Sequence, residues 1–303
     1  REHPDWLRRD SDGQAVYDLG APQSCILSPM WQEYNFRLID ELMSQYYPDG
    51  LFYNAVHYGF CHCDRCKAYY QEATGHPLPD QLLVNTEEGR RYMHFRYNET
   101  AYYLSKVWDA IHRHNPKAVL APVGNFFTEN PYFNSLSGWD ACQICQAEDI
   151  QVSETVTVVT RHQPYWTYLP GENAAGTTAI GKPAMLCIHQ MGQLGRNAVA
   201  APAQFTFDIA QAALHGGAPA INMIGTFDQE DQKGLAPLKT VFHFLKENAD
   251  CLTNFQTKAR VALVYSQKTN DFDTLADQTA FSPSQLHGLP TPTTQGDEYR
   301  GGV

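Results

Sequence analysis

Residues 50–66, GLFYNAVHYGFCHCDRC, carry the pattern that decides the fold. They begin with an apolar run over residues 51–56, which has the length and composition of a buried strand. Three cysteines in C-x-C-x-x-C order then follow: Cys61, Cys63 and Cys66. Cysteines this close cannot all pair with one another in disulfides, but their thiolates can converge on one tetrahedral zinc ion. We predict a structural zinc with Cys25 as the fourth ligand, because four thiolates leave no open coordination position. The alternative is four unrelated buried thiols.

The rest of the chain alternates short apolar runs with stretches of helical periodicity. We predict one helix that begins at Ser28-Pro29 and ends before Tyr47. Further helices are predicted over residues 87–114, 202–215 and 235–248. Besides residues 51–56, buried strands are predicted over residues 118–123, 149–154, 184–188 and 220–225. Strands that alternate with helices imply a parallel sheet whose crossovers share one hand.

A doubly wound sheet and a (β/α)8 barrel both satisfy this alternation. No G-x-G-x-x-G or G-x-x-x-x-G-K-[ST] motif follows a predicted strand, which disfavours a nucleotide-binding sheet. Polar residues instead follow several strand ends, as in a TIM barrel, whose active site is spread over the carboxyl ends of its strands. We therefore predict a (β/α)8 TIM barrel, partial over residues 1–255, with about three of its eight strands ahead of Arg1. The apolar run over residues 259–266 predicts the first strand of a second α/β domain, residues 256–303.

Composition excludes several classes of partner. The 303 residues are 43% hydrophobic, enough for a large core, and their net charge of −11 disfavours nucleic acid and anionic membranes. No apolar stretch approaches the roughly 20 residues of a membrane span. Four of the eight cysteines are assigned to zinc and Cys187 lies in an apolar run, a usage typical of a reducing compartment. We therefore predict a cytoplasmic protein, and expect its natural N-terminus to lie upstream of Arg1, because the chain does not begin with Met.

The segment Cys25-Ile26-Leu27-Ser28-Pro29, the strand that ends at Asn54 and the cysteine loop together resemble glycoside hydrolase family 42. In that β-galactosidase family, a C-x-N-S-P segment and a C-Y-C-x-x-C loop hold a structural zinc. His3-Pro4-Asp5-Trp6, Phe52-Tyr53-Asn54 and residues 225–231 (GTFDQED) resemble a related, poorly characterised group of glycoside hydrolase-like barrels. The resemblance implies a barrel followed by a trimerisation domain of flavodoxin-like, glutamine-amidotransferase-like fold. It also implies a carbohydrate substrate and a homo-oligomer, either a dimer or a trimer.

One departure from family 42 concerns catalysis. The family has an Asn-Glu pair at the end of its fourth strand, and that Glu is the general acid/base. Here Asn54 is followed by Ala55, and no Glu follows the strand before His189, where the family's nucleophile would lie. The family's two catalytic carboxylates therefore have no counterpart at the matching positions.

Glycosidases need two carboxyl groups, so other candidates are required. Glu154 ends a strand in which apolar and polar residues alternate, which places it at the predicted barrel mouth; it could instead be solvated or paired with Arg161. Asp228, two residues past Thr226, is the predicted second carboxylate, with helix capping as the alternative. Residues at or near strand ends are the predicted sugar contacts: Asn54, His57, Trp166, His189 and Gln190. Each histidine could instead be a satisfied, partly buried side chain, and the tryptophan a packed one.

These residues predict hydrolysis of an O-glycosidic bond, galactoside-like or fucoside-like, by a two-carboxylate mechanism through Glu154 and Asp228. The rival prediction is a carbohydrate-binding pseudoenzyme, which keeps the barrel and an aromatic groove but lacks working carboxylates. A Glu154 side chain that faces a pocket together with Asp228 would favour the enzyme. One that points away would favour the rival.

Overall fold

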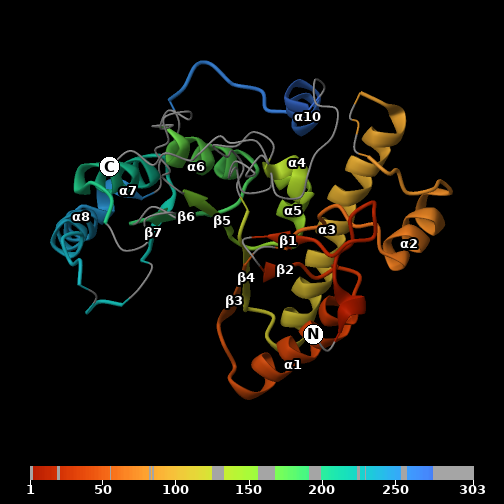
Figure 1. The fold of residues 1–303 in the computed structure, drawn as a ribbon. Helices are drawn as coiled ribbons and strands as arrows, with labels where there is room; N and C mark the ends of the chain where they lie inside the picture. Colours follow the sequence, from red (N-terminus) through yellow and green to blue (C-terminus); the bar gives the residue numbers. More distant parts are fainter. Residues whose placement is uncertain are drawn as a thin grey trace.

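Five parallel strands form the centre of the computed structural model (Figure 1). In chain order they are β3 (Gly50–Tyr53), β4 (Val119–Pro122), β5 (Gln151–Thr155), β6 (Ala184–His189) and β7 (Ala218–Asn222). Each lies where an apolar run predicted a strand, so these five predictions are confirmed. The structure describes residues 3–18, 21–54, 56–81, 83, 85–124, 133–155, 168–190, 199–223, 226–228, 230–253 and 258–275.

The strands are neighbours in the order in which they occur along the chain. β3 pairs in parallel with β4, and β6 pairs in parallel with both β5 and β7. A parallel bridge between Val123 and Val152, with the Gly124 N–H donating to the Val152 carbonyl at 2.8 Å, joins β4 to β5. A doubly wound sheet reverses its strand order part-way, whereas a (β/α)8 barrel adds each strand beside the last. The observed order matches the barrel alternative over these five strands.

Helices connect and flank the strands. The longer ones are α1 (Asn35–Gln45), α2 (Asp64–Thr74), α3 (Glu87–His114), α6 (Leu169–Ala179), α7 (Pro202–Leu214) and α8 (Leu235–Glu247). The shorter elements are η1 (Pro4–Trp6), β1 (Tyr17–Asp18), β2 (Ala21–Pro22), η2 (Met30–Tyr34), α4 (Phe133–Ser137), α5 (Ala141–Ile144), η3 (Cys145–Ala147), α9 (Ala249–Leu252) and α10 (Gln267–Leu275). In Figure 1, α1 and α3 lie toward the β3–β4 end of the row of strands, and α7 and α8 toward the β6–β7 end. Within the part of the chain that the structure describes, no helix is long and apolar enough to cross a membrane.

The longest helix, α3, shows how local sequence sets the element bounds. The Thr86 Oγ1 accepts a hydrogen bond from the Gly89 N–H at 3.0 Å, which caps the start of the helix. The helix ends before Asn115, because Pro116 disfavours a helical conformation in the residue that precedes it. Its buried face, which includes Leu104, packs against α1 and into the larger hydrophobic core together with the cysteine loop. The predicted bounds of this helix are confirmed.

A second, smaller core lies under α6 and α7. Its buried members are Ala174, Ala184, Leu186, Ile188, Phe205, Ile209 and Ala212. α7 stops where Gly216 adopts a φ of +82°, a conformation that favours glycine, as the sequence Gly216-Gly217 predicted. Full burial of a leucine, isoleucine or phenylalanine stabilises a fold by about 1.5–3 kcal/mol. This core therefore holds β6 firmly against the two helices.

Two helical predictions differ from the structure. The helix after Ser28-Pro29 begins with a π-helical turn, η2, and the side chain of Ser28 is buried and caps nothing. The turn is wide because its side chains bond backward: Gln32 Nε2 donates to the Ile26 carbonyl at 2.8 Å, and Trp31 Nε1 donates to Ser24 Oγ at 2.8 Å. Helix α2 was not predicted, because the cysteines obscure its apolar periodicity.

The apolar run at residues 259–266 forms no strand, which corrects the prediction of one there. Val261, Leu263 and Val264 are 87%, 90% and 88% exposed. A strand needs neighbouring strands to satisfy its backbone groups, and none of the described strands forms a sheet with this run. The following helix, α10, is docked instead, because the Tyr97 hydroxyl donates to the buried Asp271 carboxylate at 2.8 Å. The second domain from residue 256 stays a prediction.

Candidate functional site

The four predicted metal ligands come together in the structure. The Sγ atoms of Cys25, Cys61, Cys63 and Cys66 all lie within 4.8 Å of one another, and all four side chains are buried. The Cys25 Sγ lies 3.4 Å from the Cys66 Sγ and 3.7 Å from the Cys63 Sγ, and none of the four forms a disulfide. Tetrahedral Zn–S bonds of about 2.3 Å place sulfur atoms about 3.8 Å apart, so the observed spacing fits the metal. These four residues could hold a metal ion.

Positive charge near these four thiols would stabilise their deprotonated forms. Hydrogen bonds with neighbouring thiols raise the pKa of Cys66 and of Cys25, and the hydrogen bond with Cys25 lowers the pKa of Cys61 to about 7. A cation bound among the four thiols would favour the loss of their protons. The buried Arg8 supplies part of this charge, and its attraction to the thiolates opposes the lowering of its own pKa by burial.

Two buried arginines fix the loop that joins β3 to the cysteines. The Arg8 Nη2 donates to the Phe60 carbonyl at 2.9 Å, and the Arg96 Nε donates to the Tyr58 carbonyl at 2.7 Å. The Arg96 guanidinium also lies 4.1 Å from the centroid of the Phe60 ring, where a cation–π attraction operates. Gly59 has no room for a side chain, because a Cβ there would overlap the Arg8 guanidinium. The backbone that leads into the metal ligands is therefore held on both sides.

A second group of polar side chains lies at the carboxyl ends of β5, β6 and β7. Glu154, His189 and Asn222 come from these three adjacent strands. The Glu154 Oε1 lies 3.2 Å from the His189 Nε2 and 3.4 Å from the Asn222 Nδ2, and these two nitrogens are 3.1 Å apart. The His189 side chain is 3% exposed, whereas the Glu154 side chain is 33% exposed. A carboxylate that solvent can reach is thus held from one side by two neighbours.

The three contacts decide where the histidine proton lies. The His189 Nε2 cannot donate to Glu154 and accept from Asn222 at the same time. A proton on Nε2 lets the ring donate to the Glu154 carboxylate, and leaves the buried Nδ1, which has no hydrogen-bond partner among the described residues, as an unprotonated acceptor. The other tautomer would bury an unpaired N–H at Nδ1 and bring two lone pairs face to face. The geometry therefore favours the Nε2–H tautomer as the donor to Glu154.

Gln190 follows His189 and holds the backbone next to this group. Its side chain is 1% exposed and packs against Gly234, where a Cβ would overlap the amide. Its backbone N–H donates to the Asn222 carbonyl at 3.2 Å, and its own carbonyl accepts from the Ala200 N–H at 2.8 Å. The structure thus places Gln190 where it positions the end of β7, and its contact with sugar stays a prediction.

The other predicted site residues that the structure describes lie in the segments that follow β3 and β7. Asn54 is exposed directly after β3, and His57 is half-buried in the loop that follows. Asp228 is exposed, and a hydrogen bond from the Thr226 hydroxyl lowers the pKa of its carboxyl. Trp166 lies outside the described residues.

Sequence reasoning missed Asn222. The predicted strand extended over residues 220–225, which placed this asparagine in its middle, whereas β7 ends at Asn222. A signal was present, because an amide inside the apolar run AINMIG needs a partner when it is buried. The same signal singled out Asn54, so it applied equally to both strands.

Comparison with known proteins bears on this arrangement. No protein-family model matches the chain, and no curated protein matches its sequence. A β-galactosidase from the psychrophilic Marinomonas ef1 matches with a TM-score of 0.63 and 14% identity, over 92% of this chain and 53% of that chain. The catalytic domain of β-amylase from Paenibacillus polymyxa matches with a TM-score of 0.54 and 12% identity, over 78% of this chain and 73% of that chain. The fold is glycoside-hydrolase-like.

A third solved structure agrees. The PgaB (BpsB) glycoside hydrolase domain from Bordetella bronchiseptica matches with a TM-score of 0.54 and 11% identity, over 84% of this chain and 72% of that chain. The three proteins have different specificities, so what they share with this chain is the fold. The chain spans about half the length, 53%, of the β-galactosidase that it matches.

Proposed function

We propose that this chain belongs to a (β/α)8 glycoside hydrolase that cleaves the O-glycosidic bond of a galactoside-like or fucoside-like carbohydrate. The observation that carries the proposal is the meeting of Glu154, His189 and Asn222 at the carboxyl ends of three consecutive parallel strands. Active sites of TIM barrels lie at this edge. The glycoside-hydrolase-like fold and the chain-order succession of β3 to β7 support closure into a barrel.

In this mechanism Glu154 is the carboxylate that meets the glycosidic bond. His189 and Asn222 orient its Oε1, and its side chain is 33% exposed, so a substrate can reach the carboxylate. In a retaining glycosidase such a group attacks the anomeric carbon, and in an inverting one it removes a proton from the attacking water. The separation between the two carboxyl groups decides between them: about 5–5.5 Å for retention and about 6.5–9.5 Å for inversion.

The second carboxyl group has to act as an acid, with a pKa raised enough to keep its proton near neutral pH. Burial raises the pKa of Glu148 to about 8, but this residue precedes β5, whereas Glu154 is near the other end of the strand. Asp228 comes after β7 in the chain, although its bond with Thr226 lowers its pKa. We propose that Asp228 serves as the acid once bound sugar displaces Thr226 and excludes water from it.

The metal in this proposal is a zinc ion held by Cys25, Cys61, Cys63 and Cys66. When bound, it would stabilise the four thiolates and cross-link the segments that carry them. From the resemblance to family 42 we further propose that the protein forms a homo-oligomer, either a dimer or a trimer. Light scattering of the full-length protein tests this directly.

A non-catalytic carbohydrate-binding protein on the same fold is the second candidate. The observation that favours it is the exposed position of Asp228, whose hydrogen bond is made with Thr226. A binding protein needs Glu154 and Asn222 only as partners for sugar hydroxyls, and requires no second carboxyl group.

Hydrolysis of a panel of aryl glycosides by the full-length protein separates the candidates. The panel contains the α- and β-anomers of galactoside, fucoside, glucoside and arabinoside, and each is assayed with the wild type, Glu154→Gln and Asp228→Asn. Glu247→Gln is the matched control, because Glu247 is an exposed glutamate on α8 paired with His243. We expect one glycoside to be cleaved by the wild type and by the control, with a loss of at least a thousandfold in Glu154→Gln. Cleavage that survives in Glu154→Gln refutes its role, and no cleavage of any glycoside favours the binding protein.

A further inference from the structure

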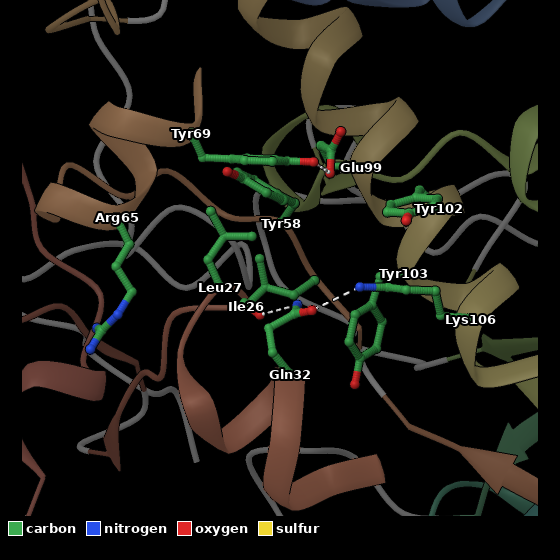
Figure 2. Close-up of a pocket in the computed structure, with 10 residues that line it drawn as sticks. All are labelled: Ile26, Leu27, Gln32, Tyr58, Arg65, Tyr69, Glu99, Tyr102, Tyr103 and Lys106. Atoms are coloured by element: carbon green, nitrogen blue, oxygen red, sulfur yellow. Dashed lines mark hydrogen bonds between the residues drawn. The ribbon is translucent and has the colours of Figure 1, made fainter. Parts of the chain in front are cut away.

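A cavity of about 420 Å³ opens between α2, α3 and the segment that joins Cys25 to η2 (Figure 2). Pockets that bind small molecules have volumes of about 300–1,000 Å³, so this one suits a ligand of about one sugar residue. Ile26 and Leu27 form an apolar wall, and Tyr69 and Tyr102 are among the aromatic rings that line it. None of the lining residues comes from β5, β6 or β7, so the cavity is separate from the Glu154 group.

Two charged side chains of α3 line the cavity, and each is held by a neutral partner. The Glu99 Oε2 accepts a hydrogen bond from the Tyr69 hydroxyl at 2.9 Å, and the Lys106 Nζ donates to the Gln32 Oε1 at 2.7 Å. Figure 2 shows the Tyr69–Glu99 pair above the Gln32–Lys106 pair, with Tyr102 to one side of both. Burial raises the pKa of Glu99 and lowers the pKa of Lys106, as it does for charges drawn partly away from water.

Both charged groups keep hydrogen-bonding capacity for a ligand. Tyr69 occupies one oxygen of Glu99, and Gln32 occupies one of the three N–H groups of Lys106. Gln32 is itself fixed, because its Nε2 donates to the Ile26 carbonyl at 2.8 Å. The cavity therefore presents an acceptor and a donor in set positions before any ligand arrives, which reduces the entropy lost on binding.

We propose that this cavity binds one neutral sugar residue, independently of the Glu154 group. The Glu99 carboxylate and the Lys106 ammonium balance each other, and the third charged lining residue, Arg65, is paired with Asp5 at 2.9 Å, so the cavity favours neither a net anion nor a net cation. A hydroxyl both donates and accepts, so the hydroxyls on a pyranose ring can satisfy Glu99 and Lys106 together. These two residues are seven positions apart on α3, about 10.5 Å along its axis. The Tyr102 ring, 55% exposed, offers an apolar surface to the C–H face of the sugar.

Saturation-transfer NMR with the full chain tests the proposal. The probes are D-galactose, L-fucose and D-glucose, with glycine and leucine as zwitterionic comparisons. Each is titrated against the wild type, Glu99→Gln, Tyr102→Ala and Glu154→Gln. Tyr46→Ala is the matched control, because Tyr46 is 70% exposed but does not line the cavity. We expect at least one sugar to bind, with an affinity about tenfold weaker in both cavity variants and unchanged in Tyr46→Ala.

Three outcomes overturn the proposal: no sugar binds, only the zwitterions bind, or sugar binding is equal in the wild type and both cavity variants. Circular dichroism verifies the fold of each variant, and Tyr102→Ala decides if Glu99→Gln misfolds, since Tyr102 is the more exposed side chain. The test of sugar binding in this cavity and the test of glycoside hydrolysis by Glu154 give independent results. If sugar binding persists in Glu154→Gln but falls in the cavity variants, it supports this site, whether or not any glycoside is cleaved. If sugar binding is lost in Glu154→Gln alone, the proposal is overturned.

Discussion

Removal of one metal ligand should destabilise the protein far more than removal of an unrelated buried thiol. The Cys25–Cys66 link spans 41 residues, and a cross-link that closes a loop of this length stabilises a fold by about 4 kcal/mol through the entropy of the unfolded chain. Cys25→Ala cuts this link and leaves the other three thiols on one short loop. Cys187→Ala is the matched control, because Cys187 is a buried free thiol outside the cluster and its loss should cost only about 1 kcal/mol.

Urea unfolding and metal analysis measure this difference. With an m-value near 3 kcal/mol/M, the difference of about 3 kcal/mol between the two variants corresponds to a shift of about 1 M in the unfolding midpoint. We expect one equivalent of zinc in the wild type and in Cys187→Ala, and less in Cys25→Ala. The reasoning is refuted if Cys25→Ala and Cys187→Ala unfold at the same urea concentration, or if the wild type purified without chelator contains no metal.

Three further perturbations test other parts of the structure. Asn222→Ala removes one of the two groups that orient Glu154. We expect kcat on the cleaved glycoside to fall about a hundredfold in steady-state kinetics, with KM little changed. An unchanged kcat would contradict this role of Asn222. Burial raises the pKa of Asp271 above its usual value of about 3.9, so the contribution of this carboxyl to α10 docking is fully present below about pH 3.9 and is lost as pH rises through the raised pKa. Proteolysis at residues 258–266 should therefore increase with pH in the wild type and lose this dependence in Asp271→Asn; the same pH dependence in both would rule out Asp271 as its source. Gly124→Ala should destabilise the fold by about 1–3 kcal/mol, since its Cβ would overlap the Trp139 ring, and an unchanged melting temperature would contradict this.

The strand at residues 184–189 could be predicted because burial on both faces leaves a nearly unbroken apolar run. Residues 151–155 are also almost entirely buried, but there the signal was the alternation of apolar and polar residues around Val152. The same reasoning failed at residues 259–266, which have strand composition but form a sheet with none of the described strands. The composition of a segment shows only that it is able to pair as a strand. Whether a neighbouring strand is present to pair with depends on the rest of the fold.

Candidate site residues could be predicted only as far as strand ends could be placed. Glu154 and His189 were predicted because their strands end where the apolar runs end, and Asn222 was missed because its run continues past the end of β7. Asp228 lies beyond the strand, where its direction depends on a turn that periodicity does not describe. The cysteine cluster needed no such placement, because ligand spacing is a local property and the fourth ligand was the nearest cysteine before it.

The position of the cysteine cluster favours a structural role for a metal held there as strongly as its four thiols do. The cluster joins the segment at Cys25, the loop after β3 and the start of α2, all of which belong to the larger core with α3. The Glu154 group lies on β5 to β7, and β6 packs in the smaller core under α6 and α7. Walls of the cavity come from the residues that follow Cys25 and precede Cys66, so metal loss should loosen the cavity first. A metal that took part in glycoside cleavage would have to lie beside the carboxylate, whereas this cluster stabilises the opposite end of the row of strands.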